Sequence, residues 1–321
     1  MAWTLLHARL HTMLRQRRLL GKGSRLLVAV SGGQDSLCLI KLLLDLQPKW
    51  QWQLAIAHCD HGWPTDVGIT DHVQELAQSW GIPFHLKTAQ TTIPETEAAA
   101  REWRYQALME IAQECGFESI VTGHTQSDRA ETLLYNLMRG AGADGLSSLT
   151  WKRSLTPEIE LVRPLLNVSR AETFQFCQQF QIPIWLDAVN QNLDYARNRI
   201  RIDLLPYLKT HFNPQVETAL AQTAELLAAE VEYLEDSADK ILQQAIAPDG
   251  RGLNRLALRS VPLALQRRVM RQFLQEVLKK APTFEQIEAL TQLINAPEGS
   301  RTSSLPGGAI AQVQGDWIVL S

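Results

Sequence analysis

The chain has 321 residues, of which 45% are hydrophobic and 20% are charged, and its formal net charge is −3. This composition is that of a globular protein long enough for two domains. The four cysteines include no C-x-x-C pair, so their spacing supports neither a zinc nor an iron–sulfur site. No segment resembles a signal peptide or is apolar enough to span a bilayer, so we expect a cytoplasmic protein without a membrane partner.

The first half of the chain alternates strand patterns with helical patterns. Strands are expected at 26–30, 54–58, 84–87 and 119–123, and helices at 37–46, 70–80, 95–114 and 129–139. This alternation predicts βαβ units and a parallel sheet with right-handed crossovers, which is an α/β fold. Ligands of such folds bind at the carboxyl ends of the strands, so functional residues should follow strand ends.

A polar loop follows the first strand. Its sequence is SGGQDS, namely Ser31, Gly32, Gly33, Gln34, Asp35 and Ser36. The first N–H groups of the next helix are unpaired and carry the positive end of its dipole, so this junction is an anion site. A carboxylate beside a phosphate needs a cation between them, so Asp35 indicates Mg²⁺. The alternative is an ordinary turn in which Asp35 and Ser36 cap the helix. The loop is neither a Walker A nor a G-x-G-x-x-G sequence.

Two further polar clusters follow strand ends. HCDHG, at 58–62, contains His58, Asp60 and His61, and GHTQSDRAET, at 123–132, contains His124, Asp128 and Glu131. Within a helix the last three side chains would share one face. The alternative for the second cluster makes Asp128 an N-cap with Glu131 as its capping-box partner. His124 lies where neither packing nor capping requires an imidazole. Arg139 then opens a glycine-rich exit suited to a loop that orders on substrate.

Arginines appear in two more segments before residue 212. In the helix at 95–105, Glu97 and Arg101 are spaced as an i,i+4 ion pair, which leaves Arg104 the freer to bind a phosphate. The segment 185–208 places Asp187, Asn190 and Asp194 ahead of Arg197, Asn198, Arg199 and Arg201. This second segment would bind nucleic acid, or it is simply a loop followed by a solvated basic helix.

The composition changes after residue 212. A long helical pattern begins near Asn213-Pro214, and further helices are expected at 261–278 and 283–294 before a small C-terminal hairpin. We therefore expect a domain over 1–212 and a smaller, mostly helical domain over 213–321. Arginines are frequent at 251–271, where they are candidates for phosphate contacts or a solvated helix face.

SGGQDS resembles the SGGxDS loop of the PP-loop ATP pyrophosphatases. SGGQDS, HCDHG, EAAAREWRY, GHTQSDRAET with RGAGADGL, RPLL and NQNLDYARNRIR also occur in the order found in tRNA(Ile)-lysidine synthetases of that family. The resemblance covers about residues 25 to 208. The chain departs from the family pattern at Trp63 and at Ala188-Val189, which weakens any inference about contacts from those two loops. Its tail resembles that of members with one small C-terminal domain.

The resemblance implies a PP-loop, adenine nucleotide alpha hydrolase-like fold and a ligase that forms a C–N bond. Such an enzyme attaches lysine to carbon 2 of the wobble cytidine of tRNA(Ile) with a CAU anticodon, which changes decoding from AUG to AUA. It acts through an adenylylated tRNA and releases AMP and pyrophosphate. The implied cofactors are ATP and Mg²⁺, and the implied partners are that tRNA and L-lysine. A homodimer is compatible with the resemblance.

The resemblance also implies roles for the quoted residues. Asp35, Arg104, His124, Asp128 and Glu131 would be catalytic, with Asp35 also holding the metal; Ser31 to Ser36, His58, Asp60 and His61 would bind the nucleotide; and Arg139, Arg197, Arg199 and Arg201 would bind RNA. Two alternatives stay open. One is a tRNA cytidine thiolase of the same superfamily, against which the lack of paired cysteines counts, and the other is a non-catalytic ATP- and RNA-binding module.

Overall fold

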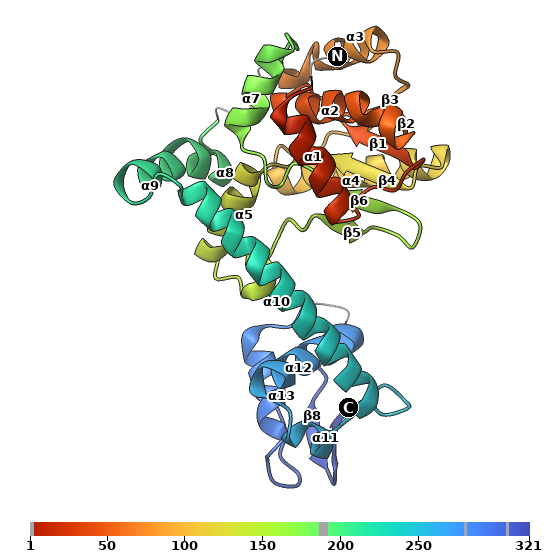
Figure 1. Ribbon diagram of the computed structural model, residues 1–321. Coiled ribbons are helices and arrows are strands. Elements are labelled where there is room, and N and C mark those ends of the chain that lie inside the picture. The colour runs from red at the N-terminus through yellow and green to blue at the C-terminus, as the bar shows by residue number, and fades with distance from the viewer. Residues whose placement is uncertain (1–2, 186–191, 279–280, 306–307) are drawn as a thin grey trace. The chain divides into compact units, whose positions relative to one another are not determined.

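The computed structural model describes residues 3–185, 192–278, 281–305 and 308–321. These residues form two compact units that divide between Ala228 and Ala229, within the long helix α10 (Val216–Ala245). Figure 1 shows both units in one view. Each unit has a hydrophobic core of its own.

A six-stranded sheet organises the first unit. In sheet order its strands are β3 (Phe84–Thr88), β2 (Gln53–Asp60), β1 (Arg25–Ala29), β4 (Ser119–Thr122), β6 (Glu160–Val162) and β5 (Lys152–Ser154). The first five are parallel, and β5 pairs antiparallel with β6. The predicted parallel α/β sheet is therefore confirmed. The crossover helices and other helices of the unit are α1 (Leu5–Gln16), α2 (Gln34–Trp50), α3 (Ile69–Ser79), α4 (Glu97–Cys115), α5 (Gln126–Met138), α6 (Ala143–Leu146), α7 (Arg170–Gln179), α8 (Ala196–Arg199), η3 (Ile200–Leu204) and α9 (Leu205–His211).

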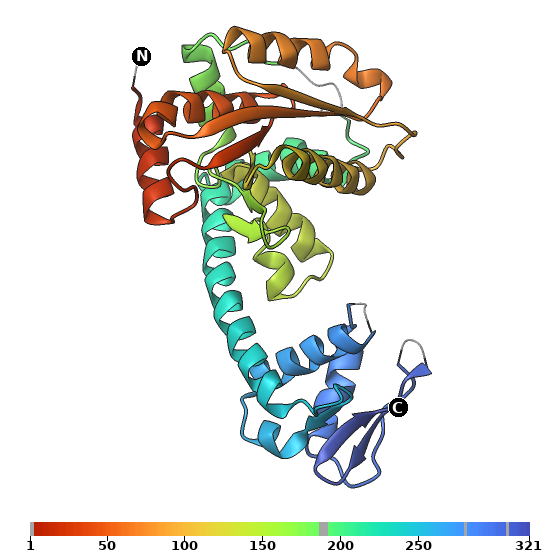
Figure 2. The same cartoon turned by 90° about the vertical axis from the view of Figure 1, so that its right-hand side faces the viewer.

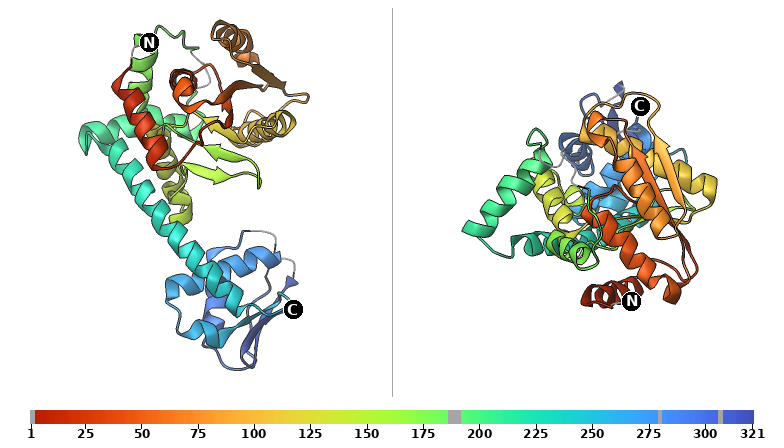
Figure 3. Two further views of the ribbon diagram at one scale, coloured as in Figure 1. Left: turned by 45° about the vertical axis from the view of Figure 1, so that its right-hand side comes forward. Right: turned by 90° about the horizontal axis from the view of Figure 1, so that it is seen from above.

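The two faces of the sheet contact different helices, because successive strand residues point to opposite sides. Leu26 and Val28 of β1 belong to a core that includes residues of α1, α2, α3 and α7, whereas Leu27 packs with α4. The sheet therefore forms the middle layer of three, as Figure 2 and the two views of Figure 3 show. Since both faces are covered, the central strand β1 is apolar from Leu26 to Ala29.

Three element boundaries differ from the sequence prediction in ways that affect the site. Helix α2 begins at Gln34 rather than at residue 37, so the second half of SGGQDS lies in its first turn. Strand β2 continues to Asp60 because that residue still pairs with Thr88 of β3, so His58 lies within the strand and not after it. Helix α5 begins at Gln126 rather than at 129. The short strands β5 and β6 carry too little periodicity to be predicted.

The second unit combines helices with a small antiparallel sheet. Its elements are the end of α10, β7 (Gly252–Asn254), α11 (Arg255–Arg259), α12 (Leu263–Leu278), α13 (Phe284–Leu293), β8 (Ala311–Gln314) and β9 (Trp317–Leu320). The sheet order is β7-β9-β8, and β8 and β9 form the predicted C-terminal hairpin. Phe273 of α12 lies at the centre of the core.

Helix α10 holds α5 through two neighbouring contacts in the first unit. The Ser127 hydroxyl donates to Glu217 at 2.7 Å, and Arg129 Nη1 binds Glu225 at 2.5 Å. Ser127 and Arg129 are both buried and stand on either side of Asp128 in the sequence. The first turn of α5 is thus fixed against α10 at the residues that flank Asp128. In the part of the chain that the structure describes, no helix is long and apolar enough to cross a membrane.

Candidate active site

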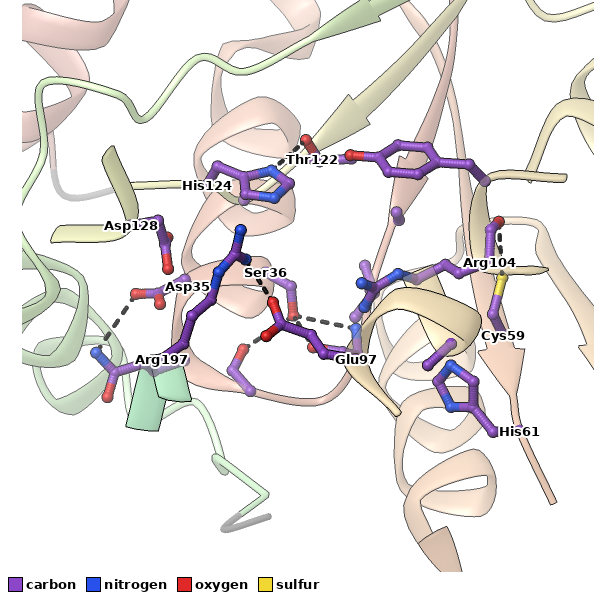
Figure 4. A pocket seen from close by; sticks show the side chains of 18 of the residues that line it. Asp35, Ser36, Cys59, His61, Glu97, Arg104, Thr122, His124, Asp128 and Arg197 are labelled. Carbon is purple, nitrogen blue, oxygen red and sulfur yellow. Dashed lines mark hydrogen bonds and ion pairs between the residues drawn. The ribbon is translucent and has the colours of Figure 1, made fainter. Parts of the chain in front are cut away.

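A pocket of about 410 Å³ opens at the carboxyl ends of β1, β2 and β4. Most of the predicted site residues line it: Ser31, Gly33, Gln34, Asp35, Ser36, His58, His61, Arg104, His124, Asp128, Glu131, Arg197 and Arg201. Figure 4 shows Arg104 and His61 on one side of the pocket and Asp35 and Asp128 on the other. The polar clusters that follow separate strands therefore meet in one place, as the strand-end rule requires.

The Ser36 hydroxyl links the two ends of the SGGQDS loop. Ser36 Oγ accepts from the Ser31 N–H at 3.2 Å and donates to the Gly33 carbonyl at 2.9 Å. Gly32 has a φ of +81°, which glycine adopts without strain. The N-cap of α2 is Gly33, which has no capping side chain. The alternative in which Asp35 and Ser36 cap the helix is therefore wrong, and the first N–H groups of α2 keep their anion-binding character.

Gly123 lies directly against this loop. A Cβ atom at Gly123 would approach the carbonyl carbon and oxygen of Asp35 and the Ser36 nitrogen to 2.9 Å. Real Cβ atoms do not come so close to backbone, so only glycine lets the end of β4 pack on the first turn of α2. This packing sets the position of the loop relative to His124.

The Asp35 carboxylate is held by helix α7. Thr173 Oγ1 donates to Asp35 Oδ1 at 2.5 Å, and Arg170 Nε lies 3.4 Å from Oδ2. Gln34 extends the link by donating to the Arg170 carbonyl at 2.7 Å. Burial raises the pKa of Asp35, against the lowering effect of Arg170, and Asp128 raises it further. The Gln34 side chain is thus bound to α7 through the Arg170 carbonyl and the Thr173 hydroxyl.

The residues of the HCDHG cluster lie in three different environments. His58 Nδ1 donates to the Val30 carbonyl at 2.8 Å, and burial lowers the pKa of this imidazole. Asp60 does not line the pocket; its carboxylate accepts from the Gly62 N–H at 2.8 Å. His61 stacks on Trp63 with ring centroids 4.8 Å apart. Its Nε2 is buried and has no hydrogen-bond partner in the described residues, so it is available to a ligand.

Arg104 is a cation aimed into the pocket with no ion-pair or hydrogen-bond partner for its side chain in the described parts of the chain. The expected pair of Glu97 with Arg101 is absent; Glu97 instead binds Arg197 Nη1 at 2.6 Å. Arg101 lies over the Tyr105 ring at 5.4 Å. The expectation that an ion pair with Glu97 ties up Arg101 is therefore wrong, because the partner of Glu97 comes from 100 residues further along the chain. Arg104 differs from Arg101 in that it lines the pocket.

Asp128 has a different capping role from the one predicted. The N-cap of α5 is Thr125, and Asp128 is the third helical residue of its capping box, accepting from the Thr125 N–H at 2.7 Å. The alternative in which Asp128 is the N-cap and Glu131 its partner is therefore wrong. Burial opposes ionisation of Asp128, but the charge of Arg201 and the hydrogen bond from the Thr125 N–H lower its pKa. Asp128 is a stable anion.

His124 lines the pocket from the connection between strand β4 and helix α5. Its Nδ1 is 2.9 Å from the Thr122 hydroxyl. Burial lowers the pKa of His124 to about 3, with Asp128 opposing this effect and Arg163 and Arg104 adding to it. The imidazole is therefore neutral at physiological pH, and it can donate or accept a hydrogen bond without adding charge.

Glu131 and Arg201 form a bidentate ion pair at the acidic end of the pocket. Arg201 Nε and Nη2 bind the two Glu131 oxygens at 2.6 and 2.7 Å, and Glu131 is only 2% exposed. Burial raises the pKa of Glu131, although Arg201 lowers it. Arg201 also approaches Asp128 at 3.5 Å. Arg201 is thus engaged with carboxylates, which differs from the free phosphate-binding arginine that its segment suggested.

Several pocket residues escaped sequence reasoning. They are Arg170, Glu97, Tyr105 and Tyr195, with Thr173 behind Asp35. The only available signal was the capping box of Ser169 and Glu172, which marks the start of α7 and so the turn that carries Arg170. Arg139 and Arg199 lie outside the pocket lining. Asp187 and Asn190 lie outside the described residues.

The arginines of the second unit are largely used within that unit. Arg267 binds Glu288 at 2.5 Å, both Arg268 and Arg271 pair with Glu235, and Arg255 donates to the Ala296 carbonyl. These contacts account for much of the 251–271 cluster as ion pairs and buried structure. They reduce the number of cations left to bind phosphate.

Comparisons with known proteins agree with this architecture. Residues 5–208 match the model of the PP-loop domain, and residues 253–316 match that of the TilS substrate binding domain. The chain is 61% identical to tRNA(Ile)-lysidine synthase of Nostoc sp., over 100% of this chain and 98% of that protein, and 57% identical to the Synechocystis sp. enzyme, over 99% and 98%. It is 37% identical to a chloroplastic relative in Zygnema circumcarinatum, over 87% and 77%.

Among solved structures, the chain resembles the U34-tRNA thiolase NcsA from Methanococcus maripaludis, described with its 4Fe–4S cluster. The TM-score is 0.60 at 16% identity, over 69% of this chain and 78% of that one, which shows the shared fold alone. Relatives that are 50% or more identical over nearly the whole chain are tRNA(Ile)-lysidine synthases. They do not favour the thiolase or the non-catalytic alternative. The chain therefore belongs to the tRNA(Ile)-lysidine synthase family, with an ATP-binding PP-loop domain and a substrate-binding domain.

Proposed function

We propose that this protein uses ATP to join L-lysine to carbon 2 of the wobble cytidine of tRNA(Ile) with a CAU anticodon. The observation that carries the proposal is that one pocket joins the cation Arg104 and the first turn of α2 with an acidic end at Asp128 and Glu131. A triphosphate fits the first end and a primary ammonium fits the second. Neutral His124 lies where the two substrates would meet.

The cationic end suits the nucleotide. The uncapped start of α2 offers N–H groups to phosphate, and Arg104 offers an unpaired guanidinium. His61 Nε2 is buried and has no hydrogen-bond partner within the described residues. These features together support ATP as the substrate of this end.

Magnesium also fits the residues present. Mg²⁺ is commonly held by one or two carboxylates together with substrate phosphates and waters, rather than by a cage of protein ligands. Asp35 is such a carboxylate at the mouth of the phosphate loop, and the described residues contain no group of three or more side chains that would bind a metal without substrate. Bound there, the ion would neutralise charge on the phosphate oxygens. Asp35→Asn is therefore expected to stop adenylylation.

In the first step the C2 oxygen of the cytosine attacks the α-phosphorus of ATP, and the bond to pyrophosphate breaks. The oxygen thereby becomes part of a good leaving group. Arg104 and the loop N–H groups stabilise charge on the phosphate oxygens as this bond breaks. His124 orients the α-phosphate or the base through a neutral hydrogen bond.

In the second step the lysine amine nitrogen attacks carbon 2 and AMP leaves. The amine has to lose a proton, because free lysine has a pKa of about 10.4. Asp128, a stable anion, suits the task of holding the ammonium, whereas Glu131 has a raised pKa and better suits the acceptance of the proton. Arg201 holds Glu131 in position through both oxygens.

The test combines the full chain with ATP, Mg²⁺, labelled lysine and an unmodified tRNA(Ile) transcript with a CAU anticodon. We expect label in the tRNA, release of pyrophosphate, and loss of both when the wobble cytidine is replaced by uridine. Pyrophosphate release without lysine incorporation would favour another nucleophile, as in a thiolase. If neither product formed, a non-catalytic binding module would replace the proposal. A cytoplasmic location and a homodimer remain predictions, the second of which sedimentation of the purified chain tests.

A further inference from the structure

An exposed apolar and aromatic surface lies at the end of α5 and on η3 and α9. We call it the α9 surface and define it by Met138, Leu204, Tyr207 and Phe212. Met138 is 61% exposed, Tyr207 55% and Phe212 72%. A hollow of about 510 Å³ brings Met138, Ile200, Leu204 and Tyr207 together, and the rings of Tyr207 and Phe212 lie 6.0 Å apart. A contiguous exposed patch of this kind usually marks a binding surface.

The α9 surface and the catalytic pocket share one wall. Arg197, Asn198 and Arg201 of the α8–η3 segment line the catalytic pocket, whereas Arg199 and Ile200 of the same segment line the hollow of the α9 surface. Residues one apart in a helix point in different directions, so this single segment presents one face to each cavity. A chain bound in the catalytic pocket would reach the α9 surface by crossing a helix.

One basic side chain, Arg199, lines the hollow of the α9 surface beside the exposed rings, and it donates to the Leu193 and Asp194 carbonyls. The other basic residues of the stretch from 195 to 212 are paired with carboxylates: Arg197 with Glu97, Arg201 with Glu131 and Lys209 with Glu217. His211 also stacks on Tyr207, with ring centroids 4.6 Å apart. Exposed aromatic rings beside a cation suit unpaired nucleotides, whose bases stack and whose phosphates need cations.

We propose that Tyr207 and Phe212 stack on the unpaired anticodon-loop nucleotides next to the wobble cytidine, while that cytidine enters the catalytic pocket. This inference rests on the proposed function, because a wobble base drawn into the pocket leaves its neighbours without a stacking partner. The α9 surface restores that lost stacking across the α8–η3 wall. It thereby gives the loop a second point of attachment that needs neither ATP nor lysine.

The test measures binding of a fluorescent RNA hairpin, with the CAU anticodon loop and its stem, to the full chain without ATP or lysine. Tyr207→Ala and Phe212→Ala are expected to weaken binding by about 5- to 150-fold, the range for loss of one base–aromatic stack. Phe174→Ala is the matched control, since Phe174 is an exposed aromatic residue on α7, 42% accessible and outside both cavities. It should bind the hairpin like the unaltered chain.

The chemistry of the replacement separates stacking from simple apolar contact. Tyr207→Trp should retain binding, whereas Tyr207→Leu, which keeps an apolar side chain without a ring, should lose it. A 4-thiouridine placed just before the wobble cytidine should crosslink to the peptide that contains Tyr207. Equal binding by the Ala, Leu and Trp variants would overturn the inference. Unchanged RNA affinity with a halved sedimenting mass would assign the surface to self-association and overturn it as well.

The outcome is independent of the proposed catalysis. A chain that binds the hairpin through Tyr207 but incorporates no lysine would refute the lysidine proposal alone. A Tyr207→Ala variant that incorporates lysine with an unchanged KM for the tRNA would refute the present inference alone.

Discussion

Arg201 binds Glu131 through two parallel hydrogen bonds, at 2.6 and 2.7 Å, and so joins the α8–η3 segment to helix α5. The pair lies at the acidic end of the pocket, where Glu131 is almost fully buried. A planar guanidinium is the one side chain that can occupy both carboxylate oxygens at once. The two hydrogen bonds from Arg201 orient the Glu131 carboxylate but transfer no proton to it, so the carboxylate can still accept a proton from a substrate.

Replacing this carboxylate separates the two chemical steps. Glu131→Gln keeps the shape of the side chain but cannot accept the amine proton, so lysine transfer should slow by about 10²- to 10⁴-fold. Adenylylation should continue, because the phosphate end is untouched. Single-turnover assays that resolve adenylylated tRNA from lysine-tRNA would check this, with the exposed Glu114→Gln as control. Failure of the variant to form the adenylylated tRNA would contradict the division of roles.

Arg104 should govern the first step. Arg104→Ala removes the unpaired cation at the phosphate end, and we expect adenylylation to slow by about 10²- to 10³-fold, as for loss of one charge-stabilising donor. Arg101→Ala, on the same helix, should have little effect, since Arg101 does not line the pocket. Pyrophosphate release in the first turnover provides the measurement. Equal rates for the two variants would argue against a phosphate role for Arg104.

Gly123 should prove sensitive to a single methyl group. In Gly123→Ala the new Cβ would lie 2.9 Å from the Asp35 backbone, so we expect a loss of about 1–3 kcal/mol in the free energy of unfolding together with weaker ATP binding. Gly142→Ala is the control, because nothing lies within 4 Å of its added Cβ. Urea unfolding and ATP titration of both variants would decide. Normal ATP affinity in Gly123→Ala would show that the loop tolerates displacement.

The lowered pKa of His124, about 3, has consequences for pH dependence. The adenylylation rate should show no ionisation of this residue near pH 6.5, since the imidazole is already neutral there. In the unfolded chain the pKa is about 6.5, so the unfolded state binds the extra proton first, and stability falls as pH drops from about 6.5 towards 3.

Urea unfolding at pH 7.5 and at pH 5 measures this contribution. The unaltered chain should lose about 1–2 kcal/mol more than His124→Asn over that interval, because only the former has to protonate residue 124 on unfolding. His58 and His61 are present in both proteins, so their effects cancel in the comparison. An equal loss for the two proteins would mean that His124 is not buried in its neutral form.

Local sequence patterns sufficed for strands β1 to β4 and for the SGGQDS loop between β1 and α2. A strand, a glycine turn and a helix follow one another directly, and the carboxyl ends of parallel strands must meet. The pairings within the site depend on contacts between distant segments and could not be predicted. Thr173 is 138 residues from Asp35, Arg201 is 70 residues from Glu131, and the partner of Glu97 proved to be Arg197. The capping role of Asp128 was missed because the helix start was placed three residues late.

The contacts of α10 with Ser127 and Arg129, on either side of Asp128, determine where the chain can be cut to give a catalytic fragment. A fragment ending at residue 208, with the PP-loop family match, would keep every side chain that lines the pocket. It would also lack Glu225, which binds buried Arg129, and Glu217, which binds Ser127. The Arg129 guanidinium, next to Asp128 in the sequence, would then be a buried charge without its carboxylate. An autonomous catalytic fragment therefore has to include Glu225, and the division between the two units at Ala228 lies just beyond it.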